Sequence, residues 1–227
     1  MSYASKFLNA KGQSCTINRT TPANSKVSIR RSTKASRDLG IREGYWEGLI
    51  LADAMLQSGE VLSITDDRGT TKYLVQSVNT DFSSTEHAFF AAKCNAVLTH
   101  KRYTQTVDED GNLVEGWQVL NAAVDAYGEI VTYRLRQEDP GLLDSTKYVF
   151  QVPKSISAQL LDRIVYNGNN YQVVSIDDVA LEGLCRIQVQ ADVRPEGEDI
   201  PDEPEEPVDP DEQEDPDEQE EQEEPEG

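Results

Sequence analysis

The sequence predicts a mainly β protein, built from one or two small β-barrel or sandwich modules and followed by a disordered acidic C-terminal tail. Three observations predict this fold class. From Gly59 onward, short runs rich in Val, Ile, Thr and Tyr are separated by turns of Gly, Asp and Asn. One such unit occurs twice in the chain. The last 32 residues contain almost nothing apolar.

The acidic charge is concentrated at the C-terminus. The chain has 227 residues, with 42 acidic and 21 basic side chains and a formal net charge of −21. Residues 196–227 hold 19 of the acidic residues and no basic one, so residues 1–195 have a net charge of −2. Charge repulsion and prolines predict that this tail is disordered. It is either a solubilising tail or a competitor for a basic surface, on a partner or on this chain.

Cysteine and histidine usage predicts neither a metal site nor any other cofactor. Cys15, Cys94 and Cys185 are widely spaced and form no Cys-x-x-Cys pair, and His87 and His100 stand apart from them. An odd number of scattered cysteines favours synthesis in a reducing, intracellular compartment. No apolar run approaches the roughly 18 residues of a membrane helix, and the N-terminus does not resemble a signal peptide, so we expect no membrane contact.

The N-terminal region predicts a short helix followed by a strand. Residues 1–14 form the expected helix, which ends at Gly12. Cys15 and Ile17 then alternate with polar residues, as in a half-buried strand.

Residues 26–42 are basic, with six Lys or Arg against one Asp, and their Ser, Thr and Gly content predicts a flexible loop. Such a loop can contact phosphates without sequence preference, or it can be a solvated loop balanced by the acidic tail. Tyr45 and Trp46 nearby either stack on bases or serve a strand or an interface. The candidate residues for contact with DNA or a partner are Arg30, Arg31, Lys34, Arg37 and Arg42.

The remainder of the chain is expected to consist of strands. A hairpin is predicted around Asp110-Gly111-Asn112, where a turn sequence separates two β-type runs. The last strand alternates cleanly, with an apolar face that begins at Cys185 and a polar face that begins at Arg186. The expected strands are residues 59–64, 72–79, 89–103, 129–137, 147–153, 160–168, 169–178 and 184–194.

The unit that occurs twice is a Gly turn followed by Tyr-x-Val-x-Ser-(Val/Ile). It begins near Gly69 with Tyr73 and again near Gly168 with Tyr171, and in each case a strand with a cysteine follows (Cys94, Cys185). We interpret this as two related modules in tandem, with both tyrosines in the module cores or hairpins. Chance is the alternative, since these residue types are common in strands.

Catalytic patterns are missing from the sequence, which predicts that the protein is not an enzyme. No nucleophile elbow, Walker loop, dinucleotide fingerprint or zinc-protease motif occurs. His87 and His100 are expected at the surface. The doublets Asp66-Asp67 and Asp177-Asp178 border turns, where Asp side chains cap backbone N–H groups, and adjacent strand residues point to opposite faces.

Residues 145–194 resemble the head-closure (stopper) and head–tail joining proteins of tailed bacteriophages. The shared pattern is a strand, a Pro, an apolar-Asp-Arg-Ile segment, a Gly turn, Tyr-x-Val-x-Ser and a final alternating strand. The matching residues are Pro153, Leu161, Asp162, Arg163, Ile164, Gly168, Tyr171, Val173, Ser175 and Ile176. The resemblance extends weakly to the first copy of the unit.

The resemblance implies a ring-forming virion protein at the neck, between portal and tail, in which a barrel loop can project into the channel and hold back packaged DNA. The chain departs from the family in three ways: it is about twice as long, its N-terminal region has no counterpart, and it ends in an acidic tail. These departures leave open a head-closure, joining or tail-completion role.

The sequence therefore predicts a non-enzymatic structural protein of a tailed-phage virion, assembled in the host cytoplasm as a homo-oligomeric ring through exposed strand edges and polar strand faces. Its expected partners are portal or adaptor proteins, tail proteins and packaged DNA, bound non-specifically. The alternative is a nucleic-acid-binding β-barrel with an autoinhibitory acidic tail. The predicted domains are an N-terminal segment (1–14), a β-rich module with the basic loop (15–103), a second β-barrel-like module (104–195) and the tail (196–227).

Overall fold

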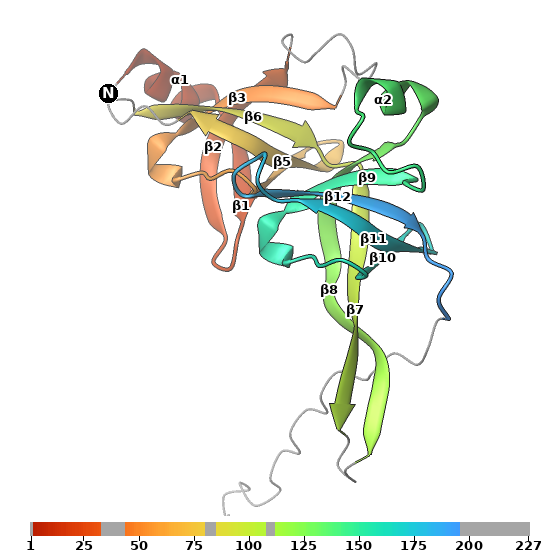
Figure 1. The fold of residues 1–227 in the computed structure, drawn as a ribbon. Helices are drawn as coiled ribbons and strands as arrows, with labels where there is room; N and C mark the ends of the chain where they lie inside the picture. The colour runs from red at the N-terminus through yellow and green to blue at the C-terminus, as the bar shows by residue number, and fades with distance from the viewer. Residues whose placement is uncertain (1, 33–43, 80–84, 108–111, 196–227) are drawn as a thin grey trace, which may run out of the picture.

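Two closed β-barrels follow one another along the chain in the computed structural model (Figure 1). The structure describes residues 2–32, 44–79, 85–107 and 112–195. This confirms the predicted fold class, with two modules rather than one. The tail, residues 196–227, lies outside the described residues.

Barrel 1 has six antiparallel strands in the order β1-β2-β3-β6-β5-β4 and closes where β4 pairs with β1. Helix α1 (Tyr3–Lys11) precedes it, begins at the N-cap Ser2 and ends at Gly12, as predicted. A 3₁₀ turn, η2 (Ala52–Ala54), connects β3 and β4. The strands are β1 (Gln13–Asn18), β2 (Ala23–Arg31), β3 (Tyr45–Leu51), β4 (Val61–Asp66), β5 (Gly69–Asn79) and β6 (Glu86–Lys93).

Barrel 2 repeats this topology, in the order β7-β8-β9-β12-β11-β10, and closes where β10 pairs with β7. Its 3₁₀ turn, η3 (Lys154–Ile156), lies between β9 and β10, as η2 does between β3 and β4. A short helix, α2 (Tyr133–Glu138), lies between β8 and β9. The strands are β7 (Ala96–Val107), β8 (Leu113–Ile130), β9 (Tyr148–Pro153), β10 (Arg163–Tyr166), β11 (Asn169–Asp177) and β12 (Leu184–Ala191).

The repeated sequence unit occupies the same place in both barrels. β5 has a register shift between Val75 and Ser77 where it pairs with β6, and β11 has one between Val173 and Ser175 where it pairs with β12. Each shift is a β-bulge within the Tyr-x-Val-x-Ser unit. The predicted equivalence of Cys94 and Cys185, however, is wrong. The N–H of Cys94 bonds to the Lys72 carbonyl, and the matching bond in barrel 2 is from Asp192 to the Asn170 carbonyl.

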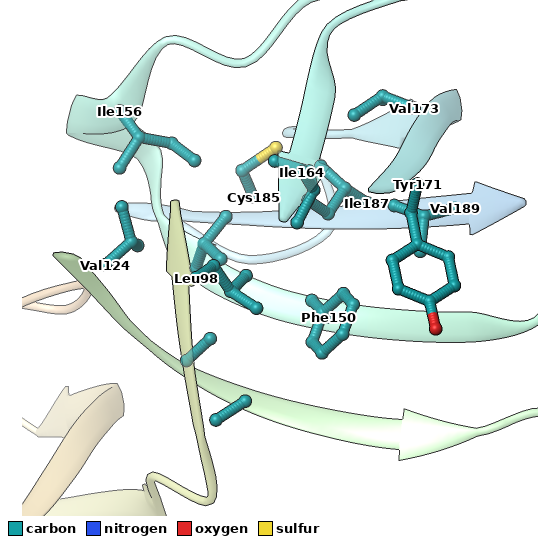
Figure 2. Close-up of a cluster of buried hydrophobic side chains, with 13 residues drawn as sticks. Leu98, Val124, Phe150, Ile156, Ile164, Tyr171, Val173, Cys185, Ile187 and Val189 are labelled. Atoms are coloured by element: carbon teal, nitrogen blue, oxygen red, sulfur yellow. The ribbon is translucent and has the colours of Figure 1, made fainter. Parts of the chain in front are cut away.

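Each barrel has its own apolar core, and the two repeated tyrosines belong to these cores, as predicted. Tyr73 lies in the cluster of barrel 1 and Tyr171 in that of barrel 2. Figure 2 shows the buried side chains of the barrel 2 core cluster, among them Phe150, Ile187 and Val173. A closed barrel pairs its edge strands, so burial of these alternating side chains and complete backbone pairing are achieved together.

The barrels are joined by only two residues, Cys94 and Asn95, between β6 and β7. The Asn95 side chain donates to the Gly128 carbonyl (2.9 Å) and accepts from its N–H (2.7 Å). The Nζ of Lys72 in barrel 1 lies 2.7 Å from the Asp125 carboxylate in barrel 2.

A glycine pair sets how closely the barrels approach. Gly59 of barrel 1 has φ +85° and Gly183 of barrel 2 has φ +72°. A Cβ on Gly183 would lie 2.0 Å from the Ser58 carbonyl oxygen, so no side chain fits there. Beside this contact, Val61, Leu74 and Leu184 form a small apolar cluster across the interface.

The structure corrects three predicted boundaries. The division placed between residues 103 and 104 falls inside β7, because barrel 2 begins at Ala96. The single strand predicted at 89–103 is two strands, broken at the joint between the barrels. The strand predicted at 129–137 ends at Ile130; Thr132 then caps α2 by accepting a hydrogen bond from the Leu135 N–H.

The predicted basic loop is also corrected in part. Lys26 to Arg31 belong to β2, which pairs with both β1 and β3, so the first six residues of the segment are regular strand. Residues 33–43 lie outside the described residues.

Candidate functional site

The β7–β8 hairpin continues past barrel 2 as a two-stranded arm (Figure 1). The arm consists of the outer pairs, from Tyr103 opposite Trp117 to Val107 opposite Leu113. β10 pairs with β7 only at residues 99–101, and β9 pairs with β8 only at residues 127–130. In the part of the chain that the structure describes, the arm therefore has two strand edges without a neighbour. Unpaired edges are ready sites for another chain. Its predicted turn residues, 108–111, lie outside the described residues.

A buried carboxylate fixes the base of the arm. Asp162, just before β10, accepts hydrogen bonds from His100 Nε2 (2.8 Å), from Arg102 Nε (2.8 Å) and from the Gln159 N–H (2.6 Å). The Asn121 amide lies 3.1 Å from His100 Nδ1. An imidazole that donates from Nε2 and accepts at Nδ1 satisfies both neighbours. This network ties β7, β8 and the η3–β10 loop together.

The pKa of Asp162 reflects this network. Burial alone would raise the pKa, but the hydrogen bonds from Arg102, His100 and the Gln159 N–H outweigh burial and hold it at about 2. The carboxylate is therefore ionised at neutral pH, and its oxygens are occupied by donors. A group in this state is a structural anchor and a poor general base.

A second buried ion pair lies beside Trp117 of the arm. Arg163 Nε lies 2.7 Å from Asp192, and the exposed fractions of these side chains are 3% and 1%. The guanidinium carbon of Arg163 lies 3.7 Å from the centre of a Trp117 ring, and that of Arg194 lies 4.7 Å from it. Stacking of an arginine on an indole is favourable, and more so when the pair is withdrawn from water. Trp117 also contacts the Tyr103 ring edge to face.

A cavity of about 600 Å³ opens next to these groups. Tyr103, Glu115 and Trp117 of the arm line it. The other lining residues include Arg102, Arg194, Leu160 and Leu161. Both leucines are about three-fifths exposed. Leu161 has a φ of +72°, a conformation that strains a bulky L residue. The cavity thus combines apolar and aromatic surface with arginines, which suits the docking of an apolar side chain.

The predicted basic residues do not gather into one described site. Arg30 and Arg31 are neighbours on β2, so their side chains point to opposite faces. Arg30 pairs with Glu47 at 2.9 Å and is 81% exposed, so its charge is balanced. Arg31 is also exposed. Lys34, Arg37 and Arg42 lie outside the described residues.

The two histidines differ from the surface role predicted for them. His100 is fully buried, because the Asp162 network encloses it. His87 is half-buried, and its Nδ1 is buried without a partner among the described atoms.

The Asp doublets behave as predicted. Asp66 accepts from the Arg68 N–H, and Asp177 accepts from the N–H groups of Val179 and Ala180. Within the described ranges, no three His, Cys, Asp or Glu side chains come together as a metal site would require.

The aromatic pair near the basic segment packs within the molecule. Tyr45 stacks on Phe90 of barrel 1 and lies 5.3 Å from the Tyr127 ring of barrel 2. Trp46 meets Tyr73 edge to face. Of the two predicted roles, the strand and interface role is the one observed.

No family model matches the chain, and no curated protein matches it. Among solved structures, the solution structure of protein SF1141 from Shigella flexneri 2a is similar over 45% of this chain and 96% of its own, with 15% identity and a TM-score of 0.36. A similarity this low supports no argument about fold or function. No described helix has both the length and the apolar character needed to span a membrane.

Proposed function

We propose that the protein is a non-enzymatic structural component of a tailed-phage virion, acting in the neck as a head-closure, joining or tail-completion ring protein. The β7–β8 arm is the observation that carries this proposal. It projects from the barrel whose residues 145–194 resemble head-closure proteins, and its described edges have no neighbouring strand.

The arm suits the joining of neighbouring subunits or of adjacent rings. A projecting ribbon with unpaired edges can add strands to another chain, and main-chain hydrogen bonds then give affinity. The sequence led us to expect subunit contacts through exposed strand edges of the modules. Because both barrels are closed, we assign these contacts to the arm. Polar strand faces remain available for the other contacts.

The first test is the mass of the purified full-length chain, measured by native mass spectrometry and by analytical ultracentrifugation without DNA. The proposal predicts a closed oligomer that appears as a ring in electron micrographs. A monomer at all accessible concentrations that binds DNA with a salt-dependent affinity would instead favour the alternative, a nucleic-acid-binding barrel.

The second test uses an arm-shortened variant in the genome that encodes the chain. Residues 104–116 are replaced by Asn-Gly, which closes a two-residue hairpin. The described residues of this segment, 104–107 and 112–116, belong to neither core cluster, so the variant should keep its melting temperature. We expect DNA-filled heads without tails in micrographs of lysates. Normal particles from the shortened variant would contradict the proposal.

A further inference from the structure

The two barrels meet through different faces. Barrel 1 uses a face around the β4–β5 hairpin, here called the hairpin face, and barrel 2 uses a face called the end face. The hairpin face consists of Gly59, Val61, Lys72, Leu74 and Cys94, with Tyr45 of β3 beside them. The end face consists of Asp125, Tyr127, Gly183 and Leu184. Because the barrels share one topology, each also has the face that the other uses. A contact between two different faces is heterologous and can be repeated from copy to copy.

The hairpin face of barrel 2 can be located by hydrogen bonds and strand pairing. The Gly59 N–H bonds to the Val75 carbonyl, and the Leu161 N–H bonds to the Val173 carbonyl. Leu161 therefore corresponds to Gly59. By the same register, Arg163 corresponds to Val61, because each lies first in its hairpin, opposite Gln172 and Leu74 respectively.

The described residues of the chain cover this second hairpin face only in part. Trp117 and Arg194 cover Arg163, and Arg163 donates to the Arg194 and Pro195 carbonyls. Leu160 and Leu161 remain about three-fifths exposed beside the cavity. An exposed leucine with positive φ at the position of an interface glycine is unfavourable in the isolated chain, and burial of its side chain against another chain would offset this cost.

The end face of barrel 1 lies under α1. The Ala52 N–H bonds to the Thr85 carbonyl as the Lys154 N–H bonds to that of Gly183, so Thr85 corresponds to Gly183. Ser5 of α1 bonds to Thr85 and Glu86. The outer side of α1 exposes Tyr3 (87%) and Phe7 (48%), four residues apart and thus on one face of the helix.

We propose that the second hairpin face binds α1 of a second copy of the chain, with Tyr3 and Phe7 packing against Leu160, Leu161 and the adjacent cavity. Within one copy, a hairpin face meets an end face, and the proposed contact repeats this pairing between copies. It would be the contact between neighbouring subunits of the ring, so it rests on the proposed function. Both partners present exposed apolar side chains. A heterologous contact of this kind closes into a ring when its rotation permits.

The first test separates binding from folding at Leu161. Asn adopts positive φ more easily than Leu, so Leu161→Asn is expected to keep or raise the melting temperature. It is expected to weaken self-association about tenfold or more, measured by sedimentation equilibrium, because an apolar anchor is lost. Phe7→Asp should weaken it similarly. Tyr133→Asp, at the exposed first residue of α2 (77% exposed), is the matched control and should leave the association unchanged.

The second test identifies the contact by cross-linking. Full-length Phe7→Cys and Leu160→Cys chains are mixed and treated with a short bis-maleimide, and a covalent dimer should form faster in the mixture than in either chain alone. The native thiols contribute little, since burial raises their pKa values to about 11 or 12. An oligomeric chain that gives no such dimer and tolerates Leu161→Asn would overturn this contact and leave the ring intact. A monomeric wild-type chain would remove the ring itself.

Discussion

At the scale of single residues, Asp162 and Asp192 make stability depend on pH. Burial raises the pKa of Asp192, but hydrogen bonds from Arg194 and Arg163 outweigh it, and both aspartates have pKa values of about 2 against an ordinary 3.8. An aspartate whose pKa is lower in the folded than in the unfolded chain stabilises the fold at pH values above the unfolded pKa. This stabilisation is lost as the pH falls from about 4 to about 2. Each aspartate should contribute about 2 kcal/mol at neutral pH.

This prediction is checked by urea unfolding between pH 7 and pH 2. The free energy of unfolding should fall mainly below pH 4. Asp192→Asn should flatten the acid limb and destabilise the protein at pH 7, because Arg163 would be left buried without its anion. Asp144, which is exposed, serves as the control. An acid limb of equal steepness in Asp192→Asn would contradict the assignment.

The glycines at positive φ provide a second residue-scale prediction. Gly168 has φ +74°, and a Cβ added there would have nothing within 4 Å, so Gly168→Ala should cost about 1 kcal/mol of conformational strain alone. Gly183→Ala carries the same strain plus a 2.0 Å contact with Ser58, and should cost about 2 kcal/mol more. Chemical denaturation of both variants gives the comparison. An equal loss of unfolding free energy in the two variants would mean that the barrels can move apart at Gly183 without cost.

At the scale of elements, the sequence predicted those segments whose local chemistry is unambiguous. The pairing of the two strands of the predicted hairpin, the α1 stop at Gly12 and the strand that ends at Pro153 were all correct. α2 was missed because six residues are too few to show helical periodicity, and its stability depends on contacts made after folding. Arg136, for example, donates to the Leu143 and Thr146 carbonyls.

The site was less predictable than the fold. Its chemistry depends on residues that are distant in sequence. Trp117 contacts Arg163, and His100 bonds to Asp162, 62 positions further along the chain. In the sequence, the Asp162-Arg163 pair stands out only as part of a strand pattern. The available signal for a buried ion pair was an Arg, immediately after an Asp, at a strand position where an apolar residue is expected. Charged residues are buried in a protein core almost only when they are paired.

At the scale of the whole molecule, the acidic tail offers a test of autoinhibition. Deleting residues 196–227 changes the formal net charge from −21 to −2. If the tail competes for the basic segment, the deletion should tighten DNA binding at low salt and steepen the dependence of affinity on salt. Fluorescence anisotropy at several salt concentrations gives both quantities. The control is a chain with a tail of equal length in which Gln and Asn replace the acidic residues. If deletion of the tail left the DNA affinity and its salt dependence unchanged, the hypothesis would be excluded.

The arm also has a consequence for symmetry, because only one of the two barrels carries it. β1 and β2 end within barrel 1, whereas β7 and β8 extend beyond barrel 2. An assembly of n chains would therefore show 2n similar lobes at coarse detail but only n spokes. A density map averaged with 2n-fold symmetry would blur the spokes to half weight, and averaging with n-fold symmetry would restore them.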